Sequence, residues 1–223
     1  MKLSVIVPVL NEAAGAPALC AHLMPFERQG VEVILVDGGS EDGTPELLNS
    51  LGYPPVRSQR GRALQMNAGA AAASGDLLLF LHADTRLPPG TLACLQSRIT
   101  QAHDWGRFDV RIEGRPAMLK LVAWLMNWRS RLTGIATGDQ AMFMTRAAFD
   151  AVGGFPPQPL MEDIEMSRRL RRLTRPLCLT DQVVTSGRRW EQRGLWRTIF
   201  LMWRLRWAYW RGVPASQLAE AYR

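Results

Sequence analysis

Three short apolar runs, each ending at polar or glycine residues, constrain the fold of this chain more than any other feature. The runs are Leu3–Val7, Val31–Val36 and Leu77–Leu81. Continuous apolar runs of this length indicate strands that are buried on both faces, as in a parallel sheet. The segments between and after the first runs have helical patterns, at about Ala16–Gln29, Pro45–Leu51 and Gly61–Ser74. Strands that alternate with helices predict a doubly wound α/β domain.

The second half of the chain has a different pattern. Residues Phe108–Glu113 alternate between apolar and polar, which is typical of a half-exposed antiparallel strand. Two further strands are expected, at Ala141–Thr145 and Leu177–Thr185. Helices are expected at Met118–Trp128, Arg146–Val152, Asp163–Leu173 and Leu195–Arg211.

Charge is distributed unevenly along the 223 residues, whose net charge is +7. Residues 164–223 carry 13 basic and 4 acidic side chains, whereas residues 1–100 carry 7 and 9. Nearly all the basic residues are arginine, which suits bidentate phosphate contacts, although genome composition explains such a bias equally well. The three scattered cysteines, Cys20, Cys94 and Cys178, disfavour a disulfide scaffold or zinc site. With no pattern typical of a signal peptide or membrane span, they predict a cytoplasmic protein.

Polar signatures follow the three apolar runs: Pro8-Val9-Leu10-Asn11-Glu12, Asp37-Gly38-Gly39-Ser40 and His82-Ala83-Asp84. Ligands of open parallel sheets bind at the carboxyl ends of the strands, so we expect the three signatures to meet in one crevice. Asp37 can accept hydrogen bonds from a nucleobase or ribose. The Asp84 carboxylate suits Mg²⁺ or Mn²⁺, with His82 as a second ligand or a phosphate donor. Each signature alone is more commonly a capped turn, so the coincidence of all three favours a site.

Two other segments have both a structural and a functional interpretation. Gln59-Arg60-Gly61-Arg62 precedes a predicted helix, where arginines and free N–H groups together favour an anion such as a diphosphate. Met161-Glu162-Asp163-Ile164-Glu165 is an ordinary pattern for the start of a helix. It also permits a carboxylate that faces the crevice and acts as a general base.

With these motifs the chain resembles the inverting nucleotide-sugar glycosyltransferases of family two, which have a GT-A fold. The resemblance covers roughly residues 3–190. It rests on Ser4–Glu12, Val36–Thr44, Gly75–Asp84, Gly153-Gly154-Phe155 and Glu162-Asp163 in this order. The compact size and His82-Ala83-Asp84-Thr85 are most similar to a small stand-alone bacterial subgroup, sometimes linked to arsenosugar or selenium-related gene sets.

The resemblance implies a mostly parallel GT-A-like sheet with an antiparallel acceptor-side part, and the residue pattern adds a C-terminal amphipathic helix. Residues 1–190 would form the catalytic domain, with a nucleotide-binding half over about 1–100 and an acceptor half over about 101–190. Residues 191–223 would form a basic, tryptophan-rich helical tail. The implied reaction moves one sugar from a nucleoside-diphosphate sugar, expected to be UDP-linked, to a hydroxyl acceptor.

The resemblance also implies roles for individual residues. Asp37 would recognise the base, Asp84 would bind the diphosphate through Mn²⁺ or Mg²⁺, and Asp163 would be the catalytic base, next to Glu162. The expected nucleotide-binding set is Pro8, Leu10, Glu12, Asp37, Arg60, Arg62, His82 and Ala83. The expected metal ligands are Asp84 and His82. The expected acceptor-side set is Gly138, Asp139, Gln140, Arg188, Arg189 and Trp190.

Three departures from the family pattern qualify this picture. His82 stands where the family usually has the first acidic residue of Asp-x-Asp, which bears on metal affinity. Gly38 replaces the second acidic residue of Asp-Asp-Gly-Ser, which weakens the assignment of base recognition. Ser186–Trp190 lacks the glutamine of the Gln-x-x-Arg-Trp motif of polymer synthases, so we expect a single-transfer enzyme.

The tail has an aromatic stripe with arginines beside it. Its apolar residues are Trp196, Ile199, Phe200, Trp203, Trp207 and Trp210. Over 195–211 the helix can pack on its own domain or a second subunit, or lie on a membrane surface, which would suit a lipid-linked acceptor. A membrane contact would make the protein peripheral at the inner membrane face. No nucleic-acid recognition motif is present, so we expect no nucleic-acid partner.

Two alternative functions remain open. One is a nucleotidyltransferase on a similar fold, although such enzymes usually carry a glycine-rich basic loop after the first strand, where this chain has Asn11-Glu12-Ala13-Ala14-Gly15. The other is a non-catalytic membrane- or RNA-binding module that uses the basic tail. It predicts binding that falls steeply with salt and needs no nucleotide.

Overall fold

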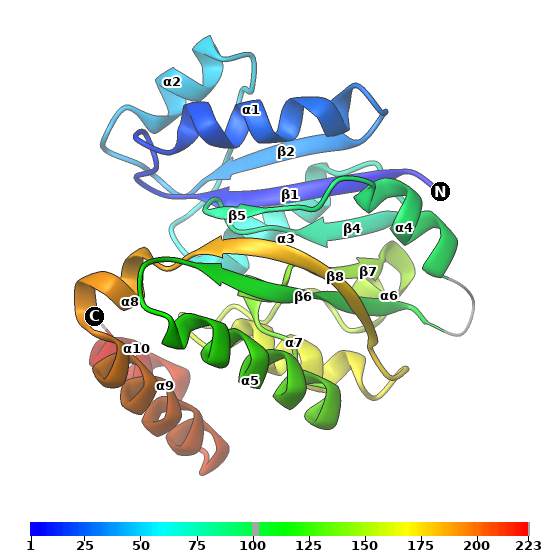
Figure 1. Cartoon of the computed structure of the whole chain (residues 1–223). Helices are drawn as coiled ribbons and strands as arrows, with labels where there is room; N and C mark the ends of the chain where they lie inside the picture. Colours follow the sequence, from blue (N-terminus) through cyan, green and yellow to red (C-terminus); the bar gives the residue numbers. More distant parts are fainter. Residues whose placement is uncertain (100–102, 223) are drawn as a thin grey trace.

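An eight-stranded sheet organises the chain in the computed structural model, which describes residues 1–99 and 103–222 (Figure 1). The strands are β1 (Leu3–Val9), β2 (Glu32–Asp37), β3 (Val56–Arg57), β4 (Leu77–Phe80), β5 (Thr85–Arg86), β6 (Trp105–Glu113), β7 (Met142–Thr145) and β8 (Leu177–Ser186). Their order in the sheet is β3-β2-β1-β4-β7-β6-β8-β5. The first four are parallel neighbours, β7 runs antiparallel to β4 and β6, and β6 pairs in parallel with β8. The predicted fold class is therefore confirmed, antiparallel part included.

Helices cover both faces of this sheet. They are α1 (Ala16–Glu27), α2 (Thr44–Ser50), α3 (Arg62–Ala72), α4 (Thr91–Arg98), α5 (Met118–Thr133), α6 (Arg146–Ala151), α7 (Glu162–Leu170), α8 (Arg188–Arg193), α9 (Leu195–Trp210) and α10 (Ala215–Tyr222), with a 3-10 helix η1 at Gly138–Gln140. Side chains of β1 alternate between the two faces, as in any strand. Val5 and Val7 join a core cluster with α1, α2, α4 and α5, while Ile6 joins a second cluster with α3, α6 and α7.

Helix α3 approaches the sheet closely because it carries Gly69. A Cβ at this position would lie 2.4 Å from Ile6 Cγ2 and 2.9 Å from Val36 Cγ2, so a larger residue would push the helix away. One turn earlier, the Gln65 amide donates hydrogen bonds to the carbonyls of Val9 at 2.8 Å and Val36 at 2.9 Å. Helix α3 thereby ties together the carboxyl ends of β1 and β2.

Strand β6 is longer than predicted, and its two halves differ. It begins at Trp105, and its first six residues are all buried. Arg107, with no exposed side-chain area, forms an ion pair with Asp109, which also pairs with Arg131 at 2.7 Å. Over the rest of the strand the predicted alternation holds, because Arg111 and Glu113 are exposed while Ile112 is buried.

The C-terminal helices pack on the domain through a face that the aromatic stripe did not predict. Leu205 of α9 and Leu218 of α10 are buried against Met161, just before α7. The aromatic stripe itself, Ile199 excepted, is exposed, so packing of its tryptophans into the protein's own core is excluded. All three cysteines are free. Across the described residues, the helices are too short or too polar for any of them to span a bilayer.

Candidate active site

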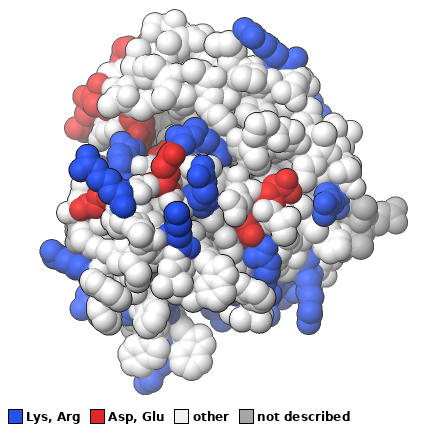
Figure 2. Space-filling view, in the orientation of Figure 1, with Lys and Arg blue, Asp and Glu red and all other residues white. Residues whose placement is uncertain are grey.

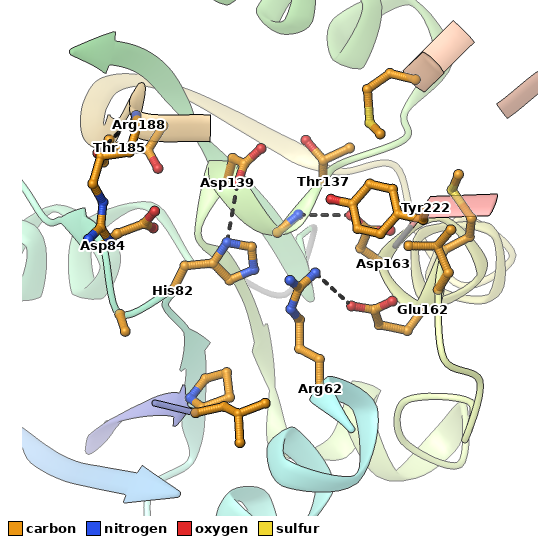
Figure 3. A pocket seen from close by; sticks show the side chains of 18 of the residues that line it. Arg62, His82, Asp84, Thr137, Asp139, Glu162, Asp163, Thr185, Arg188 and Tyr222 are labelled. Atoms are coloured by element: carbon orange, nitrogen blue, oxygen red, sulfur yellow. Dashed lines mark hydrogen bonds and ion pairs between the residues drawn. The ribbon is translucent and has the colours of Figure 1, made fainter. Parts of the chain in front are cut away.

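A pocket of about 670 Å³ lies at the carboxyl ends of β1 and β4. In Figure 1 the arrows of both strands point to the left, toward the side of the molecule that carries α8 and α10. Figure 3 shows side chains from distant parts of the chain turned toward one another in this pocket. The expected convergence of polar strand ends thus occurs for the signatures after β1 and β4, joined by η1, the start of α7 and the C-terminal helices.

Most of the residues expected from the sequence line this pocket. They are Pro8, Leu10, Glu12, Arg62, His82, Ala83, Asp84, Gly138, Asp139, Glu162, Asp163, Arg188 and Trp190. Asp37, Arg60 and Gln140 do not belong to the lining that the structure describes. Arg189 lies at the start of α8, and its side chain is outside the described part of the structure.

Asp163 sits at the start of α7, with its carboxylate held from two sides. One oxygen accepts a hydrogen bond from the Gly138 N–H at 3.0 Å, and the other from the Ile164 N–H at 2.7 Å. Burial raises the pKa of Asp163, and the adjacent Glu162 carboxylate raises it further. The two N–H donors and Arg62 oppose this, and the resulting pKa is about 6, against an ordinary 3.8. A carboxylate with this pKa can accept a proton near neutral pH.

Glu162 lies beside Asp163 but is almost fully buried, at 2% exposure. Its carboxylate is paired with the Arg62 guanidinium at 3.1 Å. Burial by itself would lower the pKa of Arg62, but Glu162, Asp163 and Asp139 outweigh it and raise that pKa. The pair therefore fixes the position of the Arg62 guanidinium in the pocket, as Figure 3 shows.

His82 points toward η1 (Figure 3). Its Nδ1 lies 3.2 Å from an Asp139 carboxylate oxygen. Its Nε2 is buried without a hydrogen-bond partner in the described structure, and it faces Gly138, where an added Cβ would lie 2.2 Å away. This position does not support the expectation that His82 ligates a metal together with Asp84. The imidazole instead packs the strand end after β4 against η1.

Asp84 is the carboxylate best placed for a metal ion. Within the described structure it accepts one hydrogen bond, from Thr85 Oγ1 at 3.4 Å, and no arginine neutralises it. Burial raises the pKa of Glu12, Arg188 lowers it, and the negative charge of Asp84 raises it again. Arg188 lies 3.9 Å from the Glu12 carboxylate.

The Asp84 carboxylate fits a hard divalent cation that takes its other ligands from a substrate. In the residues that the structure describes, no three histidine, cysteine or acidic side chains form a metal cluster by themselves. Mg²⁺ and Mn²⁺ accept carboxylate oxygens and are commonly held by one or two protein carboxylates plus substrate phosphates. Asp84 can supply such a carboxylate, so a metal here would depend on a bound phosphate.

Three expected residues have other roles in the structure. The Asp37 carboxylate accepts hydrogen bonds from Gly39 N–H at 2.9 Å and Ser40 N–H at 3.1 Å, so it orders the turn after β2. Gln140 is fully buried, and its amide bonds Thr137 N–H and the Asn127 side chain. Gln140 therefore shapes η1 from inside and does not face an acceptor. Arg60 is exposed in the loop before α3.

The C-terminal segment contributes to the pocket in a way that the sequence reasoning missed. Five residues after position 190 line it: Gln192, Thr198, Met202, Arg206 and Tyr222. Thr198, Met202 and Arg206 are spaced i, i+4 and i+8, so they share one face of α9. That spacing was a signal for a second face, which the stronger aromatic stripe obscured. Tyr222 gave no such signal, because only the fold of α10 brings it to the pocket.

Comparisons with known proteins match the part of the chain that contains most of these motifs. A model of the family described as Glycosyl transferase family 2 matches residues 4–152. The chain is 28% identical over 207 residues to a beta-monoglucosyldiacylglycerol synthase of Synechocystis sp., covering 80% of this chain and 42% of that protein. It is 35% identical over 112 residues to an undecaprenyl-phosphate 4-deoxy-4-formamido-L-arabinose transferase of Aeromonas hydrophila, covering 45% and 34%. The chain thus spans less than half the length of these curated relatives.

Solved structures share the fold. A mannosyltransferase of Pyrobaculum calidifontis, in complex with GDP-Man and Mn²⁺, superposes with a TM-score of 0.67 at 23% identity, covering 93% of this chain and 61% of that one. TarS of S. aureus, in complex with UDP-GlcNAc, superposes with a TM-score of 0.64 at 22% identity, covering 83% and 58%. These similarities establish a GT-A-like fold.

Proposed function

The chain belongs to glycosyl transferase family 2, and from that premise we propose that it transfers one sugar from a UDP-sugar to a hydroxyl acceptor with inversion at the anomeric carbon. In this reaction the acceptor oxygen forms a bond to the anomeric carbon while the bond from that carbon to the diphosphate breaks. The acceptor hydroxyl gives up its proton, and the nucleoside diphosphate leaves. The residues of the pocket divide between these two tasks.

The observation that carries the proposal is Asp163, a carboxylate of raised pKa held in the pocket by two N–H groups. We propose that Asp163 is the general base that accepts the proton of the acceptor hydroxyl. Both hydrogen bonds fix the orientation of the carboxylate, which keeps its transfer geometry constant through the reaction. Glu162 acts on Asp163 through its charge, since it raises the pKa of the base and is itself paired with Arg62.

We assign the diphosphate of the donor to the side of the pocket with Asp84 and Arg188, whereas Arg62 lies beside Glu162 (Figure 3). Asp84 would hold Mn²⁺ or Mg²⁺ together with the phosphates. A divalent ion bound there would neutralise charge that develops on the leaving diphosphate. Arg188 supplies positive charge from the protein itself at the same place. Glu12, on the same side, lies 3.9 Å from the Arg188 guanidinium.

We assign the uracil base to the turn after β2. A carboxylate accepts about four hydrogen bonds, so Asp37 keeps capacity for the base beyond the two backbone N–H groups it already binds. Pro8 and Leu10 line the neighbouring part of the pocket. The UDP and UDP-GlcNAc complexes of TarS support this choice of nucleotide by analogy of fold alone.

For the acceptor we propose a hydroxyl carried on a lipid, at the cytoplasmic face of the inner membrane, and no nucleic-acid partner. Two relatives support a lipid acceptor, because their names specify a diacylglycerol product and an undecaprenyl-phosphate substrate. Gly138, Asp139, Trp190 and Tyr222 form the wall of the pocket around Asp163 where such a hydroxyl would enter.

The test is the variant Asp163→Asn, which keeps the shape of the side chain but removes its basicity. Transfer should fall by about 10³-fold or more, while the dissociation constant of UDP with Mn²⁺, measured by calorimetry, stays within a few-fold. Glu165→Gln is the matched control, because Glu165 is in the first turn of the same helix but pairs with Arg168 and Arg169 outside the pocket. Near-normal turnover in Asp163→Asn would refute the assignment of the base.

A further inference from the structure

Two helices present rows of large apolar side chains to solvent. On α9 the row is Trp196, Phe200, Trp203, Trp207 and Trp210, with exposed fractions of 60–76%. On α5 it is Leu121, Trp124, Leu125, Trp128 and Leu132, with exposed fractions of 45–79%. We call these ten residues the aromatic surface. Exposed apolar rows of this size are uncommon on a soluble monomer and mark a surface that contacts a membrane or a protein.

The two rows belong to one part of the molecule. The inner sides of both helices pack on the same core cluster, through Leu119, Val122 and Ala123 of α5 and through Leu195 and Ile199 of α9. Figure 1 places both helices at the lower edge of the molecule, away from α1 and α2. The outer rows are therefore free to contact one extended partner at the same time.

The charges on these helices have a single sign. Neither α5 (Met118–Thr133) nor α9 (Leu195–Trp210) contains an aspartate or glutamate. Arg197 and Arg204 are exposed beside the α9 row, Arg211 lies over the Trp207 ring at 5.1 Å, and Lys120 is exposed on α5. In Figure 2 the lower edge of the visible face is white and blue, with no red side chains.

We propose that the aromatic surface docks the protein on an anionic lipid bilayer. Tryptophan is the side chain that prefers the boundary between headgroups and acyl chains, and arginines at its rim attract anionic headgroups. A second copy of this chain fits less well, because a symmetric contact would place the same arginines against one another. Charge complementarity therefore selects the lipid surface over self-association.

This contact would also orient the pocket. Helix α9 carries its aromatic row on one side, and on another side Thr198, Met202 and Arg206 line the pocket. A bilayer that contacts the outer side of α9 would thus lie one helix diameter, about 10 Å, from the side of α9 that lines the pocket. This part of the inference rests on the proposed function and deepens it: the acceptor would be an amphiphile whose sugar-accepting hydroxyl lies at headgroup depth.

The experiment is sedimentation of the full chain with sucrose-loaded vesicles, made of phosphatidylcholine alone or with phosphatidylglycerol added. We expect binding to the anionic vesicles that weakens as NaCl is raised. The double variants Trp203→Gln/Trp207→Gln and Trp124→Gln/Trp128→Gln should each weaken it by about tenfold or more, because binding scales with the apolar area that enters the bilayer. Met24→Gln and Arg28→Gln are the controls, since both residues are exposed on or just after α1, far from the aromatic surface.

Several outcomes would overturn the proposal. One is vesicle binding that the two double variants leave unchanged; another is no vesicle binding at all. A third is a dimer in light scattering that the tryptophan variants dissociate while vesicles bind no protein, which would make the surface a subunit interface. No sugar donor is present in these experiments, so their failure is separate from failure of the proposed function, which the donor and transfer assays of Asp163→Asn report.

Discussion

Replacing Gly138 by alanine perturbs the contact between Gly138 and His82, which positions both η1 and the N–H group that binds Asp163. The new Cβ would lie 2.2 Å from His82 Nε2 and 2.5 Å from His82 Cε1. Ordinary contacts between such atoms are about 3.5 Å, so the imidazole or η1 must move by about 1 Å. Either movement strains the pair between His82 and Asp139 and shifts the Gly138 N–H that donates to Asp163.

The structure sets the size of the effect. Overpacking a tight contact costs about 1–3 kcal/mol, which lowers the melting temperature of a domain of this length by about 2–10 °C. A displacement near 1 Å at a catalytic group costs about 10²-fold in rate. We therefore expect Gly138→Ala to lose about two orders of magnitude in transfer while UDP and Mn²⁺ bind nearly as before, because the donor side lies across the pocket at Asp84.

A double-mutant cycle separates the contact from a general defect. In a His82→Ala background the clashing ring is gone, so Gly138→Ala should destabilise the protein by about 1–2 kcal/mol less than it does alone. Thermal unfolding of the four proteins gives this coupling directly. If Gly138→Ala costs the same in both backgrounds, or costs nothing in the original one, the packing of His82 against Gly138 described above is wrong.

Four further predictions concern charges. Because the Asp163 pKa is raised to about 6, the transfer rate should rise with pH through about 6. In Asp163→Asn, the residual rate should no longer show this rise. The same shift means that the folded state holds the Asp163 proton more tightly than the unfolded state, so stability is lost as pH rises from about 4 to about 6. Asp163→Asn should then raise the melting temperature more at pH 7.5 than at pH 4.5. Equal increases at the two pH values would contradict the pKa shift. Arg107→Met leaves Asp109 buried but still paired with Arg131, so it should cost less in urea unfolding than the about 3–5 kcal/mol of a fully unpaired buried charge, and Arg107→Met/Asp109→Leu should recover part of the loss. Arg62→Gln removes the partner of buried Glu162, and since Arg62 is 44% exposed, we expect a loss of about 1–2 kcal/mol in the same assay.

Strand ends were the part of the site that the sequence predicted well. Leu3–Val7 and Leu77–Leu81 could be recognised as buried parallel strands from their apolar runs, and the geometry of a parallel sheet then brings Pro8 and Asp84 to one edge. Asp163 could be placed at a helix start because acidic residues favour that position. In these cases local pattern and global fold point to the same place.

Other features depend on contacts that no local pattern encodes. The alternation in β6 predicted exposed polar positions, which holds for Arg111 and Glu113, but Asp109 is buried because Arg107 and Arg131 neutralise it. Gln140 is a side chain of the right type in the right motif, yet it is buried and bonded to Thr137 and Asn127, and Asp37 orders its own turn through two backbone N–H groups. Tyr222 and one face of α9 reach the pocket because α9 and α10 pack against Met161 through Leu205 and Leu218. No local pattern in the sequence encodes this packing.

The central claim is that this pocket binds a nucleoside diphosphate through a metal held by Asp84. The most direct measurement is a thermal-shift panel of UDP, GDP, CDP and dTDP, each with and without Mn²⁺, on the original protein and on Asp84→Ala. A ligand at about 100 times its dissociation constant adds about 2.7 kcal/mol, or about 5–10 °C for a domain of this size. We expect such a shift for UDP with Mn²⁺ and its loss in Asp84→Ala. A shift of equal size in Asp84→Ala, or none for any of the four diphosphates, would contradict it.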